Sequence, residues 1–194
     1  MPPSSPTAPP PRHFFGYGSL VNRATHDYPA ARRAHLSGWR RVWVHTQARD
    51  LAFLSVRPDA GCTIAGLVAE VPGQDWTALD AREFAYARHS VTALPLTGPT
   101  LPVQVYAVPE SDARAPVPAH PILLSYLDVV VQGFLREFGQ QGVAEFFATT
   151  TGWTAPILDD RTAPRYPRAQ PLSATERAMV DAALAELGSP RLSA

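Results

Sequence analysis

The sequence predicts an α+β fold, with about six strands and one short helix in residues 13–108 and a helical C-terminal part. Two patterns support this prediction. Short runs rich in β-branched and aromatic residues, separated by polar turns, fill the first part. From residue 121 onward, apolar residues recur at helical spacing. The chain has 194 residues, 45% of them hydrophobic, which is enough to bury one core, so we expect one globular domain over residues 13–194.

The first part of the chain contains the apolar runs that we expect to form strands. The runs are residues 13–20, 40–46, 51–58, 63–71, 88–94 and 101–108. The first ends in a turn with two glycines, in the segment HFFGYGSL. The runs 40–46, 51–58 and 63–71 are separated by short polar turns, and Pro58 is expected to stop the second of them. These three runs therefore predict an antiparallel meander.

Helical patterns occupy the remaining segments. The segment DWTALDAREFAYA follows a Pro-Gly break, with Asp75 as the expected N-cap. Residues 121–139 begin with a proline and end with a glycine, as helices commonly do. The segment GVAEFFATT predicts a short second helix. The last helix starts at SATE, in which Ser173 and Glu176 have the spacing of a capping box.

Charge and composition exclude several classes of function. The 17 basic residues balance 17 acidic ones, which argues against a nucleic-acid binder. All the basic residues are arginine, so no side-chain amine exists for Schiff-base chemistry. No apolar run approaches the roughly 20 residues that a membrane helix needs. We therefore expect neither a nucleic-acid partner nor a membrane.

The single cysteine and the N-terminal segment bear on location. Cys62 has no partner for an internal disulfide, so a reducing compartment is expected. Residues 1–12 are rich in proline and serine and lack the apolar core of a signal peptide, so they are predicted to be a disordered lead. Together these features predict a cytoplasmic protein.

The common catalytic motifs are missing from the sequence. The six histidines show no spacing typical of a metal site, so no metal is expected. The segment GYGSL is neither the G-x-S-x-G motif of a serine hydrolase nor a nucleotide-binding P-loop. Cys62 stands at a strand start, where a small core residue is expected. The sequence thus shows no nucleophile, metal or cofactor site.

Two features remain as candidates for chemistry. The glycines around Tyr17 indicate either a tight turn or a cradle of backbone N–H groups for a ligand. Glu83 falls on the same predicted helix face as Trp76 and Leu79, which should turn inward. Glu83 is then either a solvated carboxylate paired with a neighbouring arginine, or a buried group whose raised pKa suits acid/base work. Tyr86, one turn on, would place a hydroxyl beside it.

Together these segments carry a resemblance to a known family. The turn FGYGSL, the apolar runs after it, the segment LDAREFAYARHSV and the strand VQVYAV resemble the γ-glutamylcyclotransferase superfamily, which includes ChaC-like and AIG2-like proteins. The resemblance covers residues 13–110 and implies a compact, mixed β-barrel-like core of about six strands with flanking helices. Residues 111–194 depart from the small members of the family, so they are expected to form a helical C-terminal extension.

The resemblance implies a reaction that needs no nucleophile and no cofactor. In this family the free α-amine of a γ-glutamyl group attacks its own γ-carbonyl, which yields 5-oxoproline and releases an amine. By motif match Glu83 is the general acid/base, and Tyr17, Gly18, Ser19 and Leu20 form the glutamyl-binding loop. Tyr106 either lines the same cavity or is a core tyrosine with a satisfied hydroxyl.

The sequence therefore predicts a γ-glutamylcyclotransferase-type lyase acting on a small γ-glutamyl substrate. Two alternatives use the same residues: a non-catalytic binding or regulatory protein of the same fold, and an amide hydrolase. The leaving amine and the oligomeric state stay open. Residues 159–171 are expected either to place Arg161, Arg165 and Arg168 on the cavity rim, where they meet an acidic leaving group, or to form a solvated loop that pairs with Asp159 and Asp160.

Overall fold

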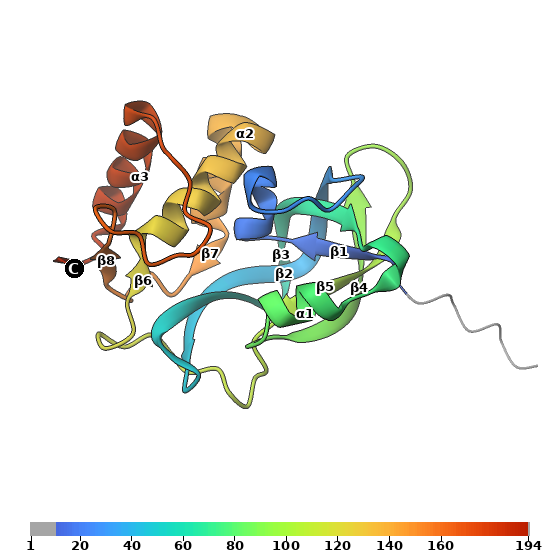
Figure 1. Ribbon diagram of the computed structural model, residues 1–194, viewed down its shortest axis with the longest axis horizontal. Coiled ribbons are helices and arrows are strands. Elements are labelled where there is room, and N and C mark those ends of the chain that lie inside the picture. The colour runs from blue at the N-terminus through green and yellow to red at the C-terminus, as the bar shows by residue number, and fades with distance from the viewer. Residues whose placement is uncertain (1–10, 194) are drawn as a thin grey trace, which may run out of the picture.

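The computed structural model describes residues 11–193, built around a sheet that closes on itself (Figure 1). The strands of this sheet are β1 (His13–Gly16), β2 (Arg32–Thr46), β3 (Arg49–Glu70), β4 (Ala87–Pro95), β5 (Leu101–Ala107) and β7 (Thr150–Thr151). Their order is β3-β1-β5-β4-β2-β7, and β3 also pairs with β2, which closes five of them into a barrel. The predicted α+β class and barrel-like core are confirmed. Residues 1–10 of the predicted disordered lead lie outside the described residues.

The long hairpin of β2 and β3 corrects one prediction. Residues 51–58 and 63–71 were expected to be two strands of a meander, but β3 runs through both as one strand of 22 residues. The register between β2 and β3 shifts between Ser37 and Trp39, and Pro58 pairs with Trp39 at this shift. A bulge is a position where a strand tolerates a residue without an N–H donor, so the proline does not end β3.

The C-terminal part forms a second layer beside the barrel. Its elements are β6 (Ile122–Leu123), α2 (Leu124–Ala148), β8 (Ile157–Asp159), α3 (Ala174–Leu187) and β9 (Arg191–Ser193). In Figure 1, α2 and α3 lie to one side of the barrel strands β1, β4 and β5. The helix predicted from Pro121 begins at Leu124 instead, because the residues between them pair with β8 as a strand. The helix predicted over residues 121–139 was expected to end at Gly139. In the structure α2 continues beyond this residue, but Gly139 has a φ of 69° and interrupts the helix there.

Short helices connect the barrel strands. They are the 3-10 helices η1 (Ser19–Val21), η2 (Arg23–Thr25) and η3 (Pro72–Gln74), and the α-helix α1 (Thr77–Arg82). The Asp75 carboxylate accepts a hydrogen bond from the Thr77 backbone N–H at 3.0 Å, close to the predicted start. The helix is shorter than predicted: it ends at Arg82, and Glu83 is its C-cap, whose backbone N–H donates to the Leu79 carbonyl at 2.9 Å.

One hydrophobic core joins the two layers. Barrel residues such as Phe15, Trp43 and Leu67 belong to the same buried cluster as Phe134 of α2 and Val180 of α3. The core thus extends from the barrel across α2 to the last helix.

No helix in residues 11–193 is long and apolar enough to cross a membrane.

The buried residue Arg41 connects the barrel to the C-terminal layer. Its side chain is fully buried, and its guanidinium stacks on the Phe134 ring at 4.8 Å. The guanidinium donates to the Tyr17 carbonyl at 2.9 Å, to the Thr149 hydroxyl at 2.8 Å and to the Ala65 carbonyl. Burial lowers the pKa of Arg41 to about 9. These partners lie in the turn after β1, in β3 and in or at the end of α2, so Arg41 fixes the relative positions of these three segments.

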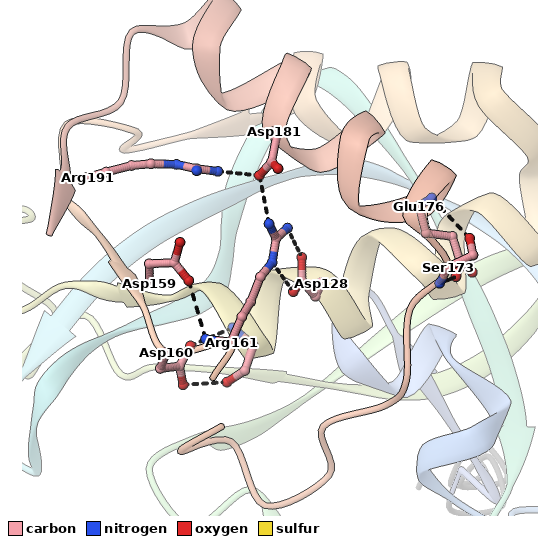
Figure 2. Close-up of polar contacts among 9 residues, drawn as sticks. Asp128, Asp159, Asp160, Arg161, Ser173, Glu176, Asp181 and Arg191 are labelled. Carbon is pink, nitrogen blue, oxygen red and sulfur yellow. Dashed lines mark hydrogen bonds and ion pairs between the residues drawn. The ribbon is translucent and has the colours of Figure 1, made fainter. Parts of the chain in front are cut away.

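An ion-pair network fastens the C-terminal helices to each other (Figure 2). Arg161 forms a bidentate pair with Asp128 of α2 at 2.8 and 2.7 Å and a second pair with Asp181 of α3 at 2.9 Å. Arg191 of β9 also pairs with Asp181. At the start of α3, Ser173 and Glu176 form the predicted capping box.

Candidate active site

Two adjoining cavities lie where the barrel meets the C-terminal layer. The larger has a volume of about 550 Å³, and its lining includes residues 49–54, residues 82–84, Tyr86, Tyr126 of α2 and residues 165–168. The smaller, a pit of about 30 Å³, lies against residues 15–20. Residues that border both are Ser19, Leu54, Glu83, Tyr86 and Tyr126. The pit therefore forms an inner recess of the larger cavity.

The turn singled out in the sequence lines the pit. Tyr17, Gly18, Ser19 and Leu20 all border it. The backbone of Gly18 has a φ of −126°, so a positive φ is not the reason for glycine here. A Cβ at this position would lie 2.7 Å from the Tyr126 hydroxyl. Glycine therefore permits a close approach between this turn and α2.

Hydrogen bonds hold the turn at both ends of Tyr17. The Tyr17 hydroxyl donates to the Tyr106 carbonyl at 2.7 Å and lies 3.3 Å from the Leu54 carbonyl, while the Tyr17 carbonyl accepts from Arg41. Burial raises the pKa of Tyr17 well above its usual value, so its hydroxyl stays protonated. The turn is thus held in a fixed conformation before any ligand arrives.

Tyr106 also borders the pit, but its hydroxyl is engaged elsewhere. The hydroxyl donates to the Asp80 carboxylate of α1 at 2.6 Å. The ring packs in a small second core with Phe14 and Leu79. Of the two expectations for Tyr106, the structure shows features of both: it borders the cavity, and its hydroxyl is satisfied within the fold.

Glu83 stands between the two cavities and is largely buried, with 16% of its side chain exposed. Burial raises the pKa of the Glu83 carboxyl, and the positive charges of Arg82 and Arg168 partly oppose this effect. The Arg82 Nε atom lies 3.3 Å from the Glu83 carboxylate. Arg88, the other neighbouring arginine, pairs with Asp80 instead. A buried carboxylate with a raised pKa is suited to proton transfer near neutral pH.

Arg82 links Glu83 to the glycine turn, a role that the sequence did not show. Its guanidinium donates to the Thr25 carbonyl at 3.0 Å and to the Ser19 hydroxyl at 3.2 Å. Only 8% of its side chain is exposed. Arg82 precedes Glu83 in the chain, but nothing in the spacing indicates that it reaches back to Ser19.

The C-terminal extension supplies a wall of the larger cavity. Tyr126 stands against Gly18, and its ring makes an edge contact with the Tyr166 ring at a centroid distance of 5.0 Å. Arg165 and Arg168 line the cavity beside Tyr166. Arg161, also expected on the rim, instead lies in the ion-pair network of Figure 2. The arginine-rich loop of residues 159–171 was the sequence signal for this wall. No sequence signal indicated that Tyr126 lies at the cavity.

The chain is similar to one known family and to several solved structures. The family model described as gamma-glutamyl cyclotransferase, AIG2-like, matches residues 14–124. A solved structure titled gamma-glutamyl cyclotransferase is 14% identical, with a TM-score of 0.57 over 88% of this chain and 98% of that chain. An uncharacterized protein from Homo sapiens, loc79017, is 15% identical, with a TM-score of 0.56 over 87% of this chain and 97% of that chain.

A third solved structure also has a similar fold. YkqA from Bacillus subtilis is 18% identical, with a TM-score of 0.57 over 71% of this chain and 53% of that chain. No curated protein matches the chain. At these identities the solved structures show a shared fold, and the family model covers more than half of the sequence. The chain therefore belongs to the gamma-glutamyl cyclotransferase, AIG2-like family.

Proposed function

We propose that the protein is a γ-glutamylcyclotransferase-type lyase that cyclises a γ-glutamyl amide or peptide to 5-oxoproline and releases the amine. The observation that carries this proposal is the position of the Glu83 carboxylate, buried between two adjoining cavities and facing the same pit as the turn Tyr17–Leu20. Membership of the family supports an activity of this type.

The reaction is an attack of the substrate on itself. The neutral α-amine forms a bond to the γ-carbonyl carbon, the ring closes, and the original amide C–N bond breaks. Glu83 accepts the proton from the α-amine and donates it to the departing nitrogen, so no proton is gained or lost overall. Holding the glutamyl chain curled for ring closure is an orientation task, and such tasks contribute about 7–11 kcal/mol in well-oriented reactions.

We assign glutamyl binding to the turn Tyr17, Gly18, Ser19 and Leu20. Oriented backbone N–H donors stabilise the negative charge that develops on the carbonyl oxygen, with little reorganisation. The hydrogen bonds around Tyr17 support this role, because they fix the turn in advance. Tyr106 contributes its carbonyl to that fixation, while its hydroxyl stays with Asp80.

Two other functions fit the same cavity: a non-catalytic binding or regulatory protein, and an amide hydrolase that uses Glu83 to activate water. The raised pKa of Glu83 favours proton transfer over simple binding of an ammonium group. The cytoplasmic location inferred from the single cysteine remains a prediction.

The product distinguishes the three functions. Purified protein is incubated with a γ-glutamyl amino acid, a γ-glutamyl amine and glutathione, and the products are identified by mass spectrometry. We expect 5-oxoproline and the free amine. Free glutamate in place of 5-oxoproline would indicate a hydrolase, and binding without any product would indicate a non-catalytic protein.

A further inference from the structure

The loop between β8 and α3 is held firmly over the larger cavity. The Arg165 backbone N–H donates to the fully buried Asp160 carboxylate at 2.8 Å. The same carboxylate accepts hydrogen bonds from the backbone N–H and the hydroxyl of Ser125 at the start of α2. Prolines at positions 164 and 167 restrict the backbone further. This loop therefore presents its side chains to the cavity at little cost in ordering.

Arg165 and Arg168 on this loop are exposed and line the cavity. Within residues 11–193, neither guanidinium donates a hydrogen bond or forms an ion pair. Arg49, from the β2–β3 hairpin, lines the same cavity; its guanidinium stacks on the exposed Phe84 ring at 4.6 Å and likewise has no carboxylate partner among the described residues. By contrast, the Arg161 guanidinium of the same loop is paired with Asp128 and Asp181.

The charges along the cavity are unevenly distributed. Its arginines are Arg49, Arg82, Arg165 and Arg168, and its acidic residues are Asp50 and Glu83. Of the two carboxylates, Glu83 is paired with Arg82, and the Asp50 side chain is fully exposed to solvent. The part of the cavity bordered by Arg165 and Arg168 therefore carries an excess of positive charge that is not neutralised by the protein.

The sizes of the two cavities indicate which part of the substrate meets this positive charge, namely the leaving amine. The pit beside the turn has a volume of about 30 Å³, far smaller than the larger cavity of about 550 Å³ that it adjoins. The leaving amine must therefore occupy the larger cavity of about 550 Å³, past Glu83. A guanidinium binds carboxylates through paired hydrogen bonds, which a neutral or cationic group does not match.

We propose that Arg165 and Arg168 bind a carboxylate on the leaving amine, so that the preferred substrates are γ-glutamyl amino acids or peptides with a free acid group rather than simple γ-glutamyl amines. This inference rests on the proposed function and names specificity residues that lie beyond the family match at residue 124. Arg49 approaches the same space from the hairpin.

Two ligands that differ only at the carboxylate test the inference: γ-glutamylalanine and γ-glutamylalaninamide. Formation of 5-oxoproline gives kcat/KM for each, and we expect the wild type to prefer the acid. Arg165→Ala and Arg168→Ala should each reduce that preference about 10- to 100-fold, since a hydrogen bond to a charged group contributes this much. The ratio of the two substrates is the readout, because the charge of Arg168 also acts on Glu83 and changes both rates alike.

Matched variants complete the test. Arg57→Ala removes an exposed arginine on β3 that does not line this cavity, and it should leave the preference unchanged. Arg168→Lys keeps the charge but not the paired geometry, so it should restore part of the preference. If Arg165→Ala and Arg168→Ala keep the wild-type ratio while 5-oxoproline still forms, the inference is overturned and the proposed function stands.

If the wild type forms no 5-oxoproline from either compound, the proposed function fails, and calorimetric binding of the same two ligands decides the inference. Tighter binding of the acid that is lost in Arg165→Ala supports a carboxylate site. Equal binding of the two ligands, or no binding, overturns it.

Discussion

At the residue scale, Glu83 is the group on which the proposed chemistry depends. Glu83→Gln keeps the shape of the side chain but does not accept a proton. We expect 5-oxoproline formation to fall at least about 100-fold, because general acid/base groups contribute about 10²–10⁴-fold. Substrate binding should be largely retained. Turnover is measured by product assay, and binding by calorimetry.

A melting curve must accompany the Glu83→Gln assay. Burial disfavours the charged carboxylate in the folded protein, so the variant should melt at the same temperature as the wild type or higher. Wild-type turnover in a well-folded Glu83→Gln protein would mean that the carboxylate is structural and that the proposed mechanism is wrong.

Arg82 should control the protonation of Glu83. Its positive charge lowers the pKa of the Glu83 carboxyl, against the effect of burial. Arg82→Gln removes that charge, so the acidic limb of the plot of kcat/KM against pH should move to higher pH. Arg82→Lys keeps the charge and should move the limb less. An unchanged pH profile in Arg82→Gln would show that Arg82 acts only through its contacts with Ser19 and Thr25.

His26 links folding stability to pH. Its Nδ1 atom accepts from the Tyr28 backbone N–H at 3.2 Å, so its Nε2 atom carries the proton and donates to the Leu20 carbonyl at 3.0 Å. Burial, with the nearby charges of Arg82 and Arg23, lowers the pKa of His26 below its usual value of 6.5. The unfolded chain therefore binds a proton at a pH at which the folded chain does not.

The contribution of His26 to stability should therefore be fully present above pH 6.5 and should be lost as the pH falls from 6.5 through the lower pKa of His26 in the folded state. Urea unfolding at several pH values measures this dependence. His13 and His45 have lowered pKa values too, so the contribution of His26 is the part of the slope that His26→Gln removes. Equal slopes in the wild type and His26→Gln would contradict the prediction.

At the scale of elements, the contact between the glycine turn and α2 sets the shape of the site. A Cβ at Gly18 would lie 2.7 Å from the Tyr126 hydroxyl and 3.2 Å from Leu54. Gly18→Ala should therefore destabilise the protein by about 1–3 kcal/mol, the usual cost of overpacking, and should raise KM.

The partner variant tests whether this contact is the cause. Tyr126→Phe removes the hydroxyl that the new methyl group would meet, so Gly18→Ala combined with Tyr126→Phe should recover part of the lost stability. Urea unfolding of the two single variants and the double variant gives the coupling energy. Strictly additive effects would show that the turn and α2 do not interact in this way.

At the scale of the whole molecule, we propose that residues 13–194 form one cooperative unit rather than a core of residues 13–110 with a separable extension. The hydrophobic cluster contains residues of the barrel, α2 and α3. Arg41, fully buried, has the Thr149 hydroxyl among its partners. Removing the extension would leave this guanidinium with an unsatisfied donor and expose the apolar wall of the barrel.

A chain truncated after residue 110 should therefore not fold. We expect no cooperative thermal transition by circular dichroism, whereas the full chain should show a single one. A control truncated only at the N-terminus, starting at residue 11, keeps all the described contacts and should still melt in a single cooperative transition. A cooperative melt of residues 1–110 would show that the barrel is an independent domain.

The sequence by itself determined the features that depend on neighbouring residues. Apolar runs with β-branched residues predicted the barrel strands, because side chains alternate across a strand and this pattern is local. Ser173 and Glu176 predicted the start of α3, since a capping box needs only residues three apart. The turn at Tyr17 and the position of Glu83 were recognised as motifs, and the family resemblance that they carry is confirmed.

Only the tertiary structure decided the features that join distant segments. Pro58 lies inside a continuous strand because the register between β3 and β2 shifts next to it, and no pattern around Pro58 reveals its partner. Helical periodicity predicted an apolar face on α2 but did not indicate which elements that face packs against. The sequence therefore did not predict that Tyr126 contacts the glycine turn or that Arg41 donates to its Tyr17 carbonyl. The arginines of the last loop were visible in the sequence, but packing alone separates Arg161, held in an ion-pair network, from Arg165 and Arg168 at the cavity. The physical reason is that a side chain's partners across the fold are set by how the elements pack, which local sequence patterns do not encode.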